Sequence, residues 1–395
     1  MDDTSLVWRK FIFPDQIRIQ RCKKMPELGP QILFFSGGTA LNKISRALKY
    51  YTHNSIHLVT PFDSGGSSAR LREEFTMPAV GDLRSRLMAL ADETVLGQPD
   101  VFNLFNYRLD KQGQAAELRN ELDSIVAGTH ELIQPITEPM RQLIRTQLAI
   151  ILSKISSRFE LRGASIGNLI IAGGYLNNQQ QLDPIVFLFS RLVKALGTVQ
   201  TIADSIYCLA AELENGEIVI GQHNITGKES DPLRSPIKRI FLNESPVSYC
   251  PIPCEILPDR KDMIINADII CYPPGSFYSS VLANILPLGV ADSILNNPNL
   301  KVYLPNLGVD PEQLGMGLLS QVEAIIKAVS NGSTLDAKGI LDFLILDEAH
   351  YQSETTEELD TIRKLGVGIL VAPLVKEASL YYDEEAVCQF LVSLV

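Results

Sequence analysis

A glycine turn follows the first strongly apolar stretch of the chain. Residues 36–39 read Ser-Gly-Gly-Thr and come directly after the apolar residues 32–35, and apolar side chains then recur at helical spacing over 41–48. At such a strand–turn–helix junction, free backbone N–H groups and the positive end of the helix dipole point at the turn, and glycines let an anion approach the backbone. The pattern indicates a phosphate site at Gly37, Gly38 and Thr39; an ordinary tight turn is the alternative.

A second loop of this kind follows the predicted strand 55–60. It combines an acid, two glycines, hydroxyl groups and two arginines, namely Asp63, Gly65, Gly66, Ser67, Ser68, Arg70 and Arg72. In open α/β sheets the ligand lies outside the carboxyl ends of the strands, so this loop and the glycine turn should share one crevice. A solvated glycine–serine linker is the alternative interpretation. Further along, Asp82 is placed to cap a helix that contains Arg84.

A third candidate loop follows the short apolar strand 267–272. Residues 273–280 read Pro-Pro-Gly-Ser-Phe-Tyr-Ser-Ser, so that Gly275, Ser276 and Ser279 stand between a strand and a helix start. We interpret it as a second phosphate loop.

The elements that must position these loops alternate between strand and helix throughout the chain. This alternation predicts an α/β fold, a doubly wound, mainly parallel Rossmann-like sheet. Helical spacing over about 110–160 predicts a helical insertion, and the pair 206–213 and 217–220 predicts a hairpin in a β-rich insertion over about 204–250. We expect a single domain over 31–395, preceded by edge strands within 1–30.

Composition and motifs exclude several classes of protein. The net charge of −11 argues against nucleic-acid binding, and no apolar run is long enough for a membrane span. Six scattered cysteines and a charged start without a signal peptide favour the cytoplasm, and Cys250 and Cys254 lack the partners of a zinc site.

Three motifs that would indicate other classes of enzyme are either absent or lack their partner motif. Residues 347–350 read Asp-Glu-Ala-His, but no Walker-type phosphate loop accompanies them, so Asp347 and Glu348 are expected to cap a loop after a strand. The dinucleotide fingerprint is missing, and no flavin or nicotinamide prosthetic group is expected. Nucleophile elbows are absent and the five histidines form no visible dyad, which disfavours a serine hydrolase.

Taken together, the ordered motifs resemble the CofD superfamily, which holds the 2-phospho-L-lactate transferases and the gluconeogenesis factors of the YvcK type. The matching segments are residues 37–40, 63–72, 81–84, 104–108, 163–169 and 274–284. The chain departs from the family pattern at three positions: Ala40 replaces a glycine, Ser64 an aspartate and Ala164 a histidine. These losses remove a carboxylate and an imidazole that a catalyst would use.

The resemblance implies a set of site residues. Asp63 would be the catalytic residue and would hold magnesium or orient the acceptor, while Arg70, Arg72 and Arg84 would neutralise phosphate oxygens. The nucleotide- and phosphate-binding set would be Gly37, Gly38, Thr39, Gly65, Gly66, Ser67, Ser68, Asp82, Asn168, Gly275, Ser276, Ser279 and Asn284.

Two functions stay open on this basis. One is transfer of a phospho-containing group from a nucleotide-diphospho donor to an alcohol acceptor. The other is a non-catalytic regulator that senses a UDP-sugar. Either implies a nucleotide or nucleotide-sugar ligand and no nucleic-acid or membrane partner; a homodimer is left open. A weaker third hypothesis is an interaction scaffold that uses the helices of 110–160.

Overall fold

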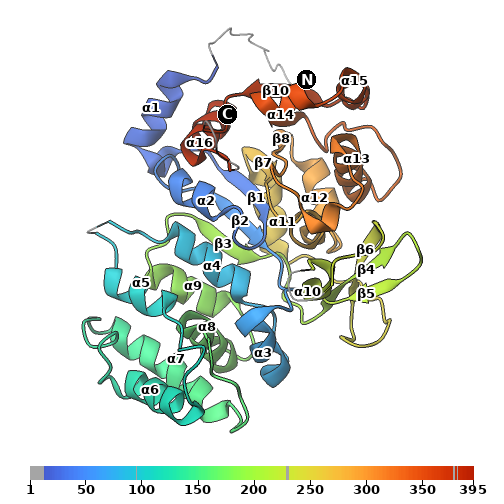
Figure 1. The fold of residues 1–395 in the computed structure, drawn as a ribbon. Coiled ribbons are helices and arrows are strands. Elements are labelled where there is room, and N and C mark those ends of the chain that lie inside the picture. Colours follow the sequence, from blue (N-terminus) through green and yellow to red (C-terminus); the bar gives the residue numbers. More distant parts are fainter. Residues whose placement is uncertain (1–12, 95, 228–230, 377–378, 380) are drawn as a thin grey trace.

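A computed structural model describes residues 13–94, 96–227, 231–376, 379 and 381–395. Within them, seven parallel strands form the central sheet, in the order β10-β9-β8-β7-β1-β2-β3 (Figure 1). The strands are β1 (Ile32–Ser36), β2 (Ile56–Val59), β3 (Thr198–Thr201), β7 (Ile269–Tyr272), β8 (Leu300–Tyr303), β9 (Phe343–Asp347) and β10 (Gly368–Ala372). This confirms the predicted doubly wound α/β fold.

The strand order reverses between β1 and β7. The chain builds outward from β1 through β2 to β3, and later outward in the other direction from β7 to β10. The crevice at the carboxyl ends of β1 and β7 is therefore the switch point of the sheet, where doubly wound folds bind their ligands. The glycine turn follows β1 and the Gly275 loop follows β7, so the topology brings two of the predicted loops together.

Helices cover both faces of the sheet because β1 is apolar on both sides. Phe34 and Phe35 are both buried, and since successive side chains point to opposite faces, they enter different clusters. Phe34 packs toward α1 (Gln16–Lys24), α2 (Asn42–Leu48) and α16 (Glu384–Ser393), through residues such as Leu48 and Phe390. Phe35 joins the cluster that receives α11 (Pro258–Asn266), α12 (Val290–Asn296), α13 (Leu318–Val329) and α15 (Thr356–Lys364).

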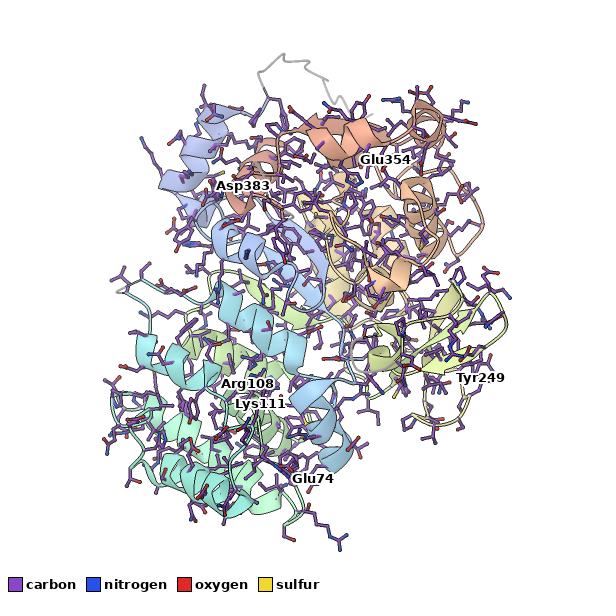
Figure 2. The ribbon with its side chains drawn as sticks, in the orientation of Figure 1. Glu74, Arg108, Lys111, Tyr249, Glu354 and Asp383 are labelled. Carbon is purple, nitrogen blue, oxygen red and sulfur yellow. The ribbon has the colours of Figure 1, made fainter. Side chains whose placement is uncertain are left out.

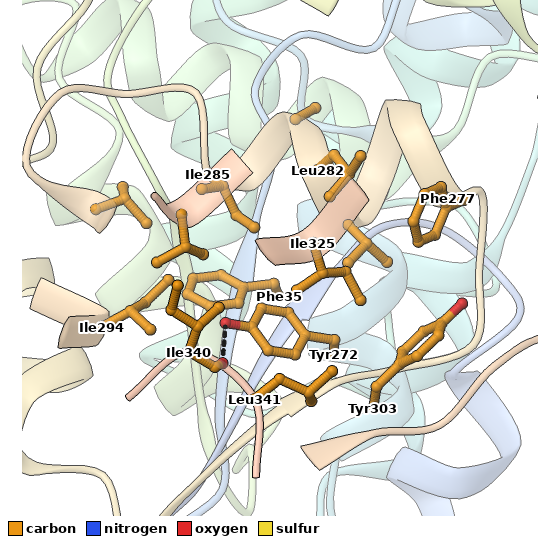
Figure 3. Close-up of a cluster of buried hydrophobic side chains, with 14 of the residues drawn as sticks. Phe35, Tyr272, Phe277, Leu282, Ile285, Ile294, Tyr303, Ile325, Ile340 and Leu341 are labelled. Carbon is orange, nitrogen blue, oxygen red and sulfur yellow. Dashed lines mark hydrogen bonds between the residues drawn. The ribbon is translucent and has the colours of Figure 1, made fainter. Parts of the chain in front are cut away.

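The cluster around Phe35 also fixes the loop after β7. Figure 3 shows Phe277 at its edge and Tyr272 at its centre, with the Tyr272 hydroxyl donating to the Ile340 carbonyl at 3.1 Å. The loop continues as a π-helical turn, Phe277–Val281, and a 3₁₀ turn, Leu282–Asn284; further 3₁₀ turns are Pro26–Leu28 and Pro311–Gln313.

A helical lobe lies beyond β2 and β3 (Figure 1). It contains α3 (Gly66–Phe75), α4 (Gly81–Leu90), α5 (Pro99–Asn106), α6 (Ala115–Ala127), α7 (Met140–Lys154), α8 (Ile166–Asn177) and α9 (Asp183–Leu192). The predicted insertion of 110–160 is thus helical. Leu118, Leu122, Ile144 and Leu148 pack into the core of this lobe, so α6 and α7 direct their apolar faces inward.

A small antiparallel sheet forms the β-rich insertion, in the order β5-β4-β6. The predicted hairpin is present as β4 (Cys208–Leu213) and β5 (Ile218–Ile220), and the short helix α10 (Gln222–Ile225) follows it. The third strand, β6 (Ile237–Asn243), was not anticipated from its polar, proline-studded surroundings.

The prediction of edge strands near the N-terminus is wrong where the structure describes the chain. Residues 1–12 lie outside the described residues, and 16–24 form the helix α1, capped by Asp15. Ile19 and Cys22, three residues apart, are buried beside α16, so packing of one helical face outweighed the apolar–polar alternation. Asp347 and Glu348 were expected to cap a loop after a strand. Asp347 follows β9 and caps the helix α14 (Glu348–Ser353) by accepting the Ala349 N–H at 2.9 Å, while Glu348 is the first residue of that helix. None of the described helices is long and apolar enough to span a membrane.

Candidate functional site

A hollow of about 240 Å³ lies at the switch point of the sheet. It collects the loops after β1, β2 and β7, the start of α4 and the segment around α10. Its lining residues are Gly37, Gly38, Thr39, Ala40, Leu41, Asp63, Gly65, Asp82, Gln222, His223, Thr226, Pro274, Gly275, Ser276 and Ser280.

The glycine turn is held from behind by a buried arginine. Arg86, on α4, is fully buried and donates to the carbonyls of Gly37 and Gly38 at 2.8 and 2.9 Å and to the Ser45 hydroxyl at 2.7 Å. In a planar trans peptide the C=O and the following N–H point in opposite directions. The N–H groups of Gly38 and Thr39 are therefore turned away from Arg86, and both residues line the hollow.

Arg86 was not singled out by the sequence analysis. Burial lowers its pKa to about 10, against a smaller opposing effect of Asp82, so the guanidinium is charged at neutral pH. A fixed positive charge behind two backbone donors favours an anion in front of them. Only its proximity in sequence to Asp82 and Arg84 gave a hint, because a helix pattern does not show which arginine faces inward.

Glycine is required at the turn because two side chains from other elements lie against it. A Cβ built on Gly37 would lie 2.0 Å from the Ser280 Oγ, and one built on Gly38 would lie 3.1 Å from the Asp82 Oδ1. Asp82 is the second residue of α4, whose N-cap is Val80, so the prediction that Asp82 caps this helix is wrong. Its carboxylate faces the glycine turn instead.

Asp63 lines the hollow as well, and Ser64 follows it in the chain. The Asp63 Oδ1 accepts the Gly65 N–H at 2.9 Å, and its Oδ2 would lie 3.4 Å from a Cβ on Gly81, next to the start of α4. The Ser64 hydroxyl is 2.7 Å from the Nδ1 of His223, which enters from the β-rich insertion. The sequence analysis missed His223, because the contact spans 159 residues and leaves no local signal.

The Gly275 loop is arranged differently from the glycine turn. Gly275 and Ser276 line the hollow, but the following N–H groups bond to carboxylates of the chain itself. Phe277 N–H donates to Asp310 at 2.8 Å, and Tyr278 and Ser279 N–H donate to Glu312 at 2.9 and 2.8 Å. The Ser279 hydroxyl also bonds to Glu312, so this residue serves the loop and does not line the hollow.

Glu312 is 1% exposed, and burial raises its pKa to about 7, with a further contribution from Asp310. The proposed second cradle therefore holds protein carboxylates in the position expected for a phosphate. The sequence analysis did not single out Asp310 or Glu312, because both lie in a loop beyond β8.

The predicted arginines line other parts of the structure. Arg72 donates to the carbonyls of Phe62, Asp63, Ile206 and Tyr207 and so ties the Asp63 loop to the β-rich insertion. Arg70 donates to the carbonyls of Glu160 and Arg162. Arg84 is largely buried, and burial together with the nearby Arg108 lowers its pKa to about 10.

The remaining predicted residues flank the hollow. The Asn168 amide donates to the Ser67 hydroxyl at 3.0 Å, and the Ser68 hydroxyl accepts the Val80 N–H at 3.0 Å. Asn284 is fully buried and donates to the carbonyls of Ser36 and Ser280, which joins β1 to the Gly275 loop. Gly66 and Ser67 line a separate hollow on the other side of the α3 start.

A magnesium ion fits this site only if the ligand shares in holding it. Among the described residues, no three histidine, cysteine or acidic side chains gather into a metal cluster. Asp63 and Asp82 both line the hollow. Mg²⁺ in proteins is commonly held by one or two carboxylates together with substrate phosphates and water. The donor set present matches that arrangement.

The doubly wound sheet with a glycine turn at its switch point places the chain among the Rossmann-like α/β proteins. Comparison of the sequence with models of known protein families identifies the family within this fold class. The profile described as "2-phospho-L-lactate transferase CofD" matches residues 32–375. The chain belongs to this family.

Relatives of known name and structure agree with this assignment. The chain is 28% identical over 375 residues to the gluconeogenesis factor of Bacillus subtilis, covering 93% of this chain and 98% of that protein. It is also 28% identical to the gluconeogenesis factor of Listeria monocytogenes, over 71% of this chain and 68% of that protein. A crystal structure of a UPF0052 family member from Bacillus halodurans superposes with a TM-score of 0.65 at 25% identity, covering 91% of this chain and 98% of that one.

Proposed function

We propose that the protein binds a nucleoside-diphosphate ligand, such as a nucleotide sugar, with its diphosphate against Gly37, Gly38 and Thr39. The observation that carries this proposal is the hold of Arg86 on the two glycine carbonyls. It fixes the turn with its N–H groups toward the hollow before any ligand arrives, so little conformational entropy is lost on binding. The volume of about 240 Å³ suits a diphosphate, and the nucleoside and sugar extend beyond it.

The acids of the hollow give the proposal a second requirement. Asp63 and Asp82 stand where the ligand's phosphates would lie, and like charges in a crevice repel. Mg²⁺ held jointly by these carboxylates and the phosphate oxygens would remove that repulsion. Binding should therefore weaken when divalent cations are removed. We place this function in the cytoplasm, since the six cysteines are all free thiols.

Titration calorimetry with UDP-glucose and with GDP tests the proposal. We expect binding of at least one of them in the presence of Mg²⁺ and a loss of affinity of tenfold or more with EDTA. Gly38→Val should abolish binding, because its side chain would enter the hollow beside Asp82. Circular dichroism checks that this variant is folded. Unchanged affinity in Gly38→Val, or no binding of any nucleoside diphosphate by the wild type, would contradict the proposal.

A second candidate, catalysis, is favoured by the pair formed by Ser64 and His223. With its proton on Nδ1 and donated to Ser64, the imidazole presents the Nε2 lone pair to a substrate. In transfer, an acceptor alcohol would attack the phosphorus of the donor and lose its proton to His223, while the P–O bond to the nucleoside monophosphate breaks. The family pattern has an aspartate and a histidine where this chain has Ser64 and Ala164. The pair of Ser64 and His223 would supply the general base that those replacements remove.

His223→Gln separates catalysis from regulation. If the protein is a transferase, this variant should bind the nucleotide within about threefold of the wild type but release no nucleoside monophosphate from a diphospho donor with an added alcohol. If it is a regulator, as the names of the relatives favour, neither wild type nor variant turns over. Release of nucleoside monophosphate at equal rates by both would rule out His223 as the base.

A further inference from the structure

A second hollow, of about 490 Å³, lies on the other side of the α3 start from the glycine turn. Its wall gathers Arg70 from α3, Arg108 and Lys111 from the segment after α5, and Arg162 from the loop before α8, with Glu160 as the one acid. Figure 2 labels Arg108 and Lys111, which lie together beside α3 and α8. Four cations in one hollow stand out in a chain whose net charge is −11.

The single acid of this hollow is already neutralised. Glu160 accepts from the backbone N–H of Arg162 at 2.9 Å and from its guanidinium at 2.6 Å. The hydrogen bonds from Arg162 lower the pKa of this carboxyl to about 2, so it stays ionised and paired. Among the described residues, the ion pair of Glu160 within 4.0 Å is with Arg162, while Arg70 acts on this carboxyl only at longer range. The hollow thus keeps an excess of positive charge.

Arg84, which interacts electrostatically with Arg108, adds a further positive charge near this hollow. Arg84 is largely buried and its Nε has no hydrogen-bond partner among the described residues. Burial, together with the charge of the nearby Arg108, lowers its pKa to about 10, against a smaller opposing effect of Asp82. Two guanidinium groups that repel each other are stabilised by an anion placed near both. Asp82, which lines the first hollow, supplies part of that negative charge to Arg84.

The start of α3 supplies neutral donors. Its N-cap, Gly65, makes no side-chain capping bond, and Gly66 and Ser67 of the first turn line the hollow. Ser67 accepts hydrogen bonds from the Asn168 amide at 3.0 Å and, at the longer distance of 3.5 Å, from Arg108. Because both lone pairs of the Ser67 oxygen accept hydrogen bonds, its hydroxyl proton is left to donate to a different acceptor. Asn168 is 2% exposed, which holds this orientation in place.

We propose that this hollow, defined by Arg70, Arg108 and Lys111, is a second anion-binding site for a compact phosphorylated or polycarboxylate metabolite. Guanidinium groups bind planar and tetrahedral oxyanions with two parallel hydrogen bonds, and the helix start and Ser67 add directional donors. Gly65 lines the first hollow and Gly66 the second, so ligands bound in the two hollows would lie on either side of the start of α3. The site does not depend on the nucleotide proposal.

Pyrophosphate and citrate, titrated separately by calorimetry, test the site. The double variant Arg108→Glu/Lys111→Glu should bind both anions at least tenfold more weakly than the wild type. Lys338→Glu/Lys364→Glu is the matched control, since both lysines are exposed, lie in the C-terminal third of the chain and give the same change in net charge. The control should bind within twofold of the wild type. Equal affinity in the two double variants would overturn the proposal.

Two further variants separate this site from the glycine turn. In Gly38→Val, which blocks the first hollow, citrate and pyrophosphate binding should persist. Arg108→Lys keeps the charge but removes the planar fork, and should weaken binding by about threefold to tenfold. Loss of all anion binding in a folded Gly38→Val protein would assign the anions to the first hollow and overturn the proposal. A wild type that binds neither anion would do the same.

Discussion

The two glycine-containing loops at the switch point look alike in sequence but are built in opposite ways. Behind the turn after β1 stands a buried cation, Arg86, which takes the carbonyls and leaves the N–H groups toward the hollow. The loop after β7 is faced by the buried Glu312 and the half-buried Asp310, which take the N–H groups themselves. The comparison teaches that a strand–glycine–helix pattern predicts a set of backbone donors, whereas the tertiary partner decides whether a ligand or the protein uses them.

The difference also assigns the two loops separate tasks. The first turn is preorganised for an external anion. The second is held rigid by internal carboxylates and contributes Gly275, Ser276 and Ser280 to the hollow as a wall. Each of the following experiments perturbs one side of this comparison, and they are ordered by the size of the expected effect.

Removing the cation behind the first turn should have the largest effect. Arg86→Met leaves the carbonyls of Gly37 and Gly38 and the Ser45 hydroxyl without their donor in a buried site. We expect a loss of about 4 kcal/mol in the free energy of unfolding, measured in urea, together with loss of nucleotide binding. Arg46→Met, which changes an exposed arginine on α2, should cost less than about 1 kcal/mol. Similar losses in both variants would contradict the role of Arg86.

Glu312, the buried acid that faces the loop after β7, should make the stability of the protein depend on pH. Because the pKa of Glu312 in the folded protein is about 7, above its ordinary value of 4.5, the folded state binds more protons between these values. Its contribution to stability is therefore fully present below about pH 4.5 and is lost as the pH rises through 7, by about 3 kcal/mol. Glu312→Gln, which cannot ionise, should remove this component from urea-unfolding curves recorded between pH 5 and 8.

Glu131→Gln, at an exposed position in the helical lobe, serves as the control for that experiment. Its curve should follow the wild type at every pH. A Glu312→Gln protein whose stability falls with pH as steeply as that of the wild type would show that this carboxyl does not titrate in the range.

Adding a methyl group to each loop should sharpen the contrast between them. In Gly37→Ala the new Cβ would lie 2.0 Å from the Oγ and 2.4 Å from the Cβ of Ser280, whereas a Cβ on Gly275 meets no atom within 4 Å. We expect Gly37→Ala to lower the free energy of unfolding by about 2 kcal/mol and Gly275→Ala by less than about 0.5 kcal/mol. Adding Ser280→Gly to Gly37→Ala should restore part of the loss; no restoration would place the clash elsewhere.

The smallest effect is expected from the second acid of the β7 loop. Asp310→Asn keeps an oxygen that can accept the Phe277 N–H but removes a charge that raises the pKa of Glu312. The stability should change by about 1 kcal/mol at most, and its fall between pH 5 and 8 should become smaller than in the wild type. A steeper fall would contradict the coupling between the two acids.

Much of the fold followed from the sequence because its signals are local. The strands around Phe35, Ile270 and Leu344 are short apolar runs, and the helices between them bury one face each. The helix α1 was misassigned since alternation over a few residues fits either structure. Strand β6 was not predicted because its residues are held by pairing with β4, and the sequence of a strand does not show which strand it pairs with.

For the site, the sequence alone determined which loops carry glycine, acid and hydroxyl groups, and the parallel topology already placed them at one edge of the sheet. Only the tertiary structure decided what each group does. It brought His223 to Ser64 across 159 residues, put Arg86 behind one loop and Glu312 behind the other, and turned Arg70 and Arg72 away from the hollow. The reason is physical: a backbone donor or a charged side chain acquires its role from the group that faces it, and in a folded chain that group comes from a distant part of the sequence.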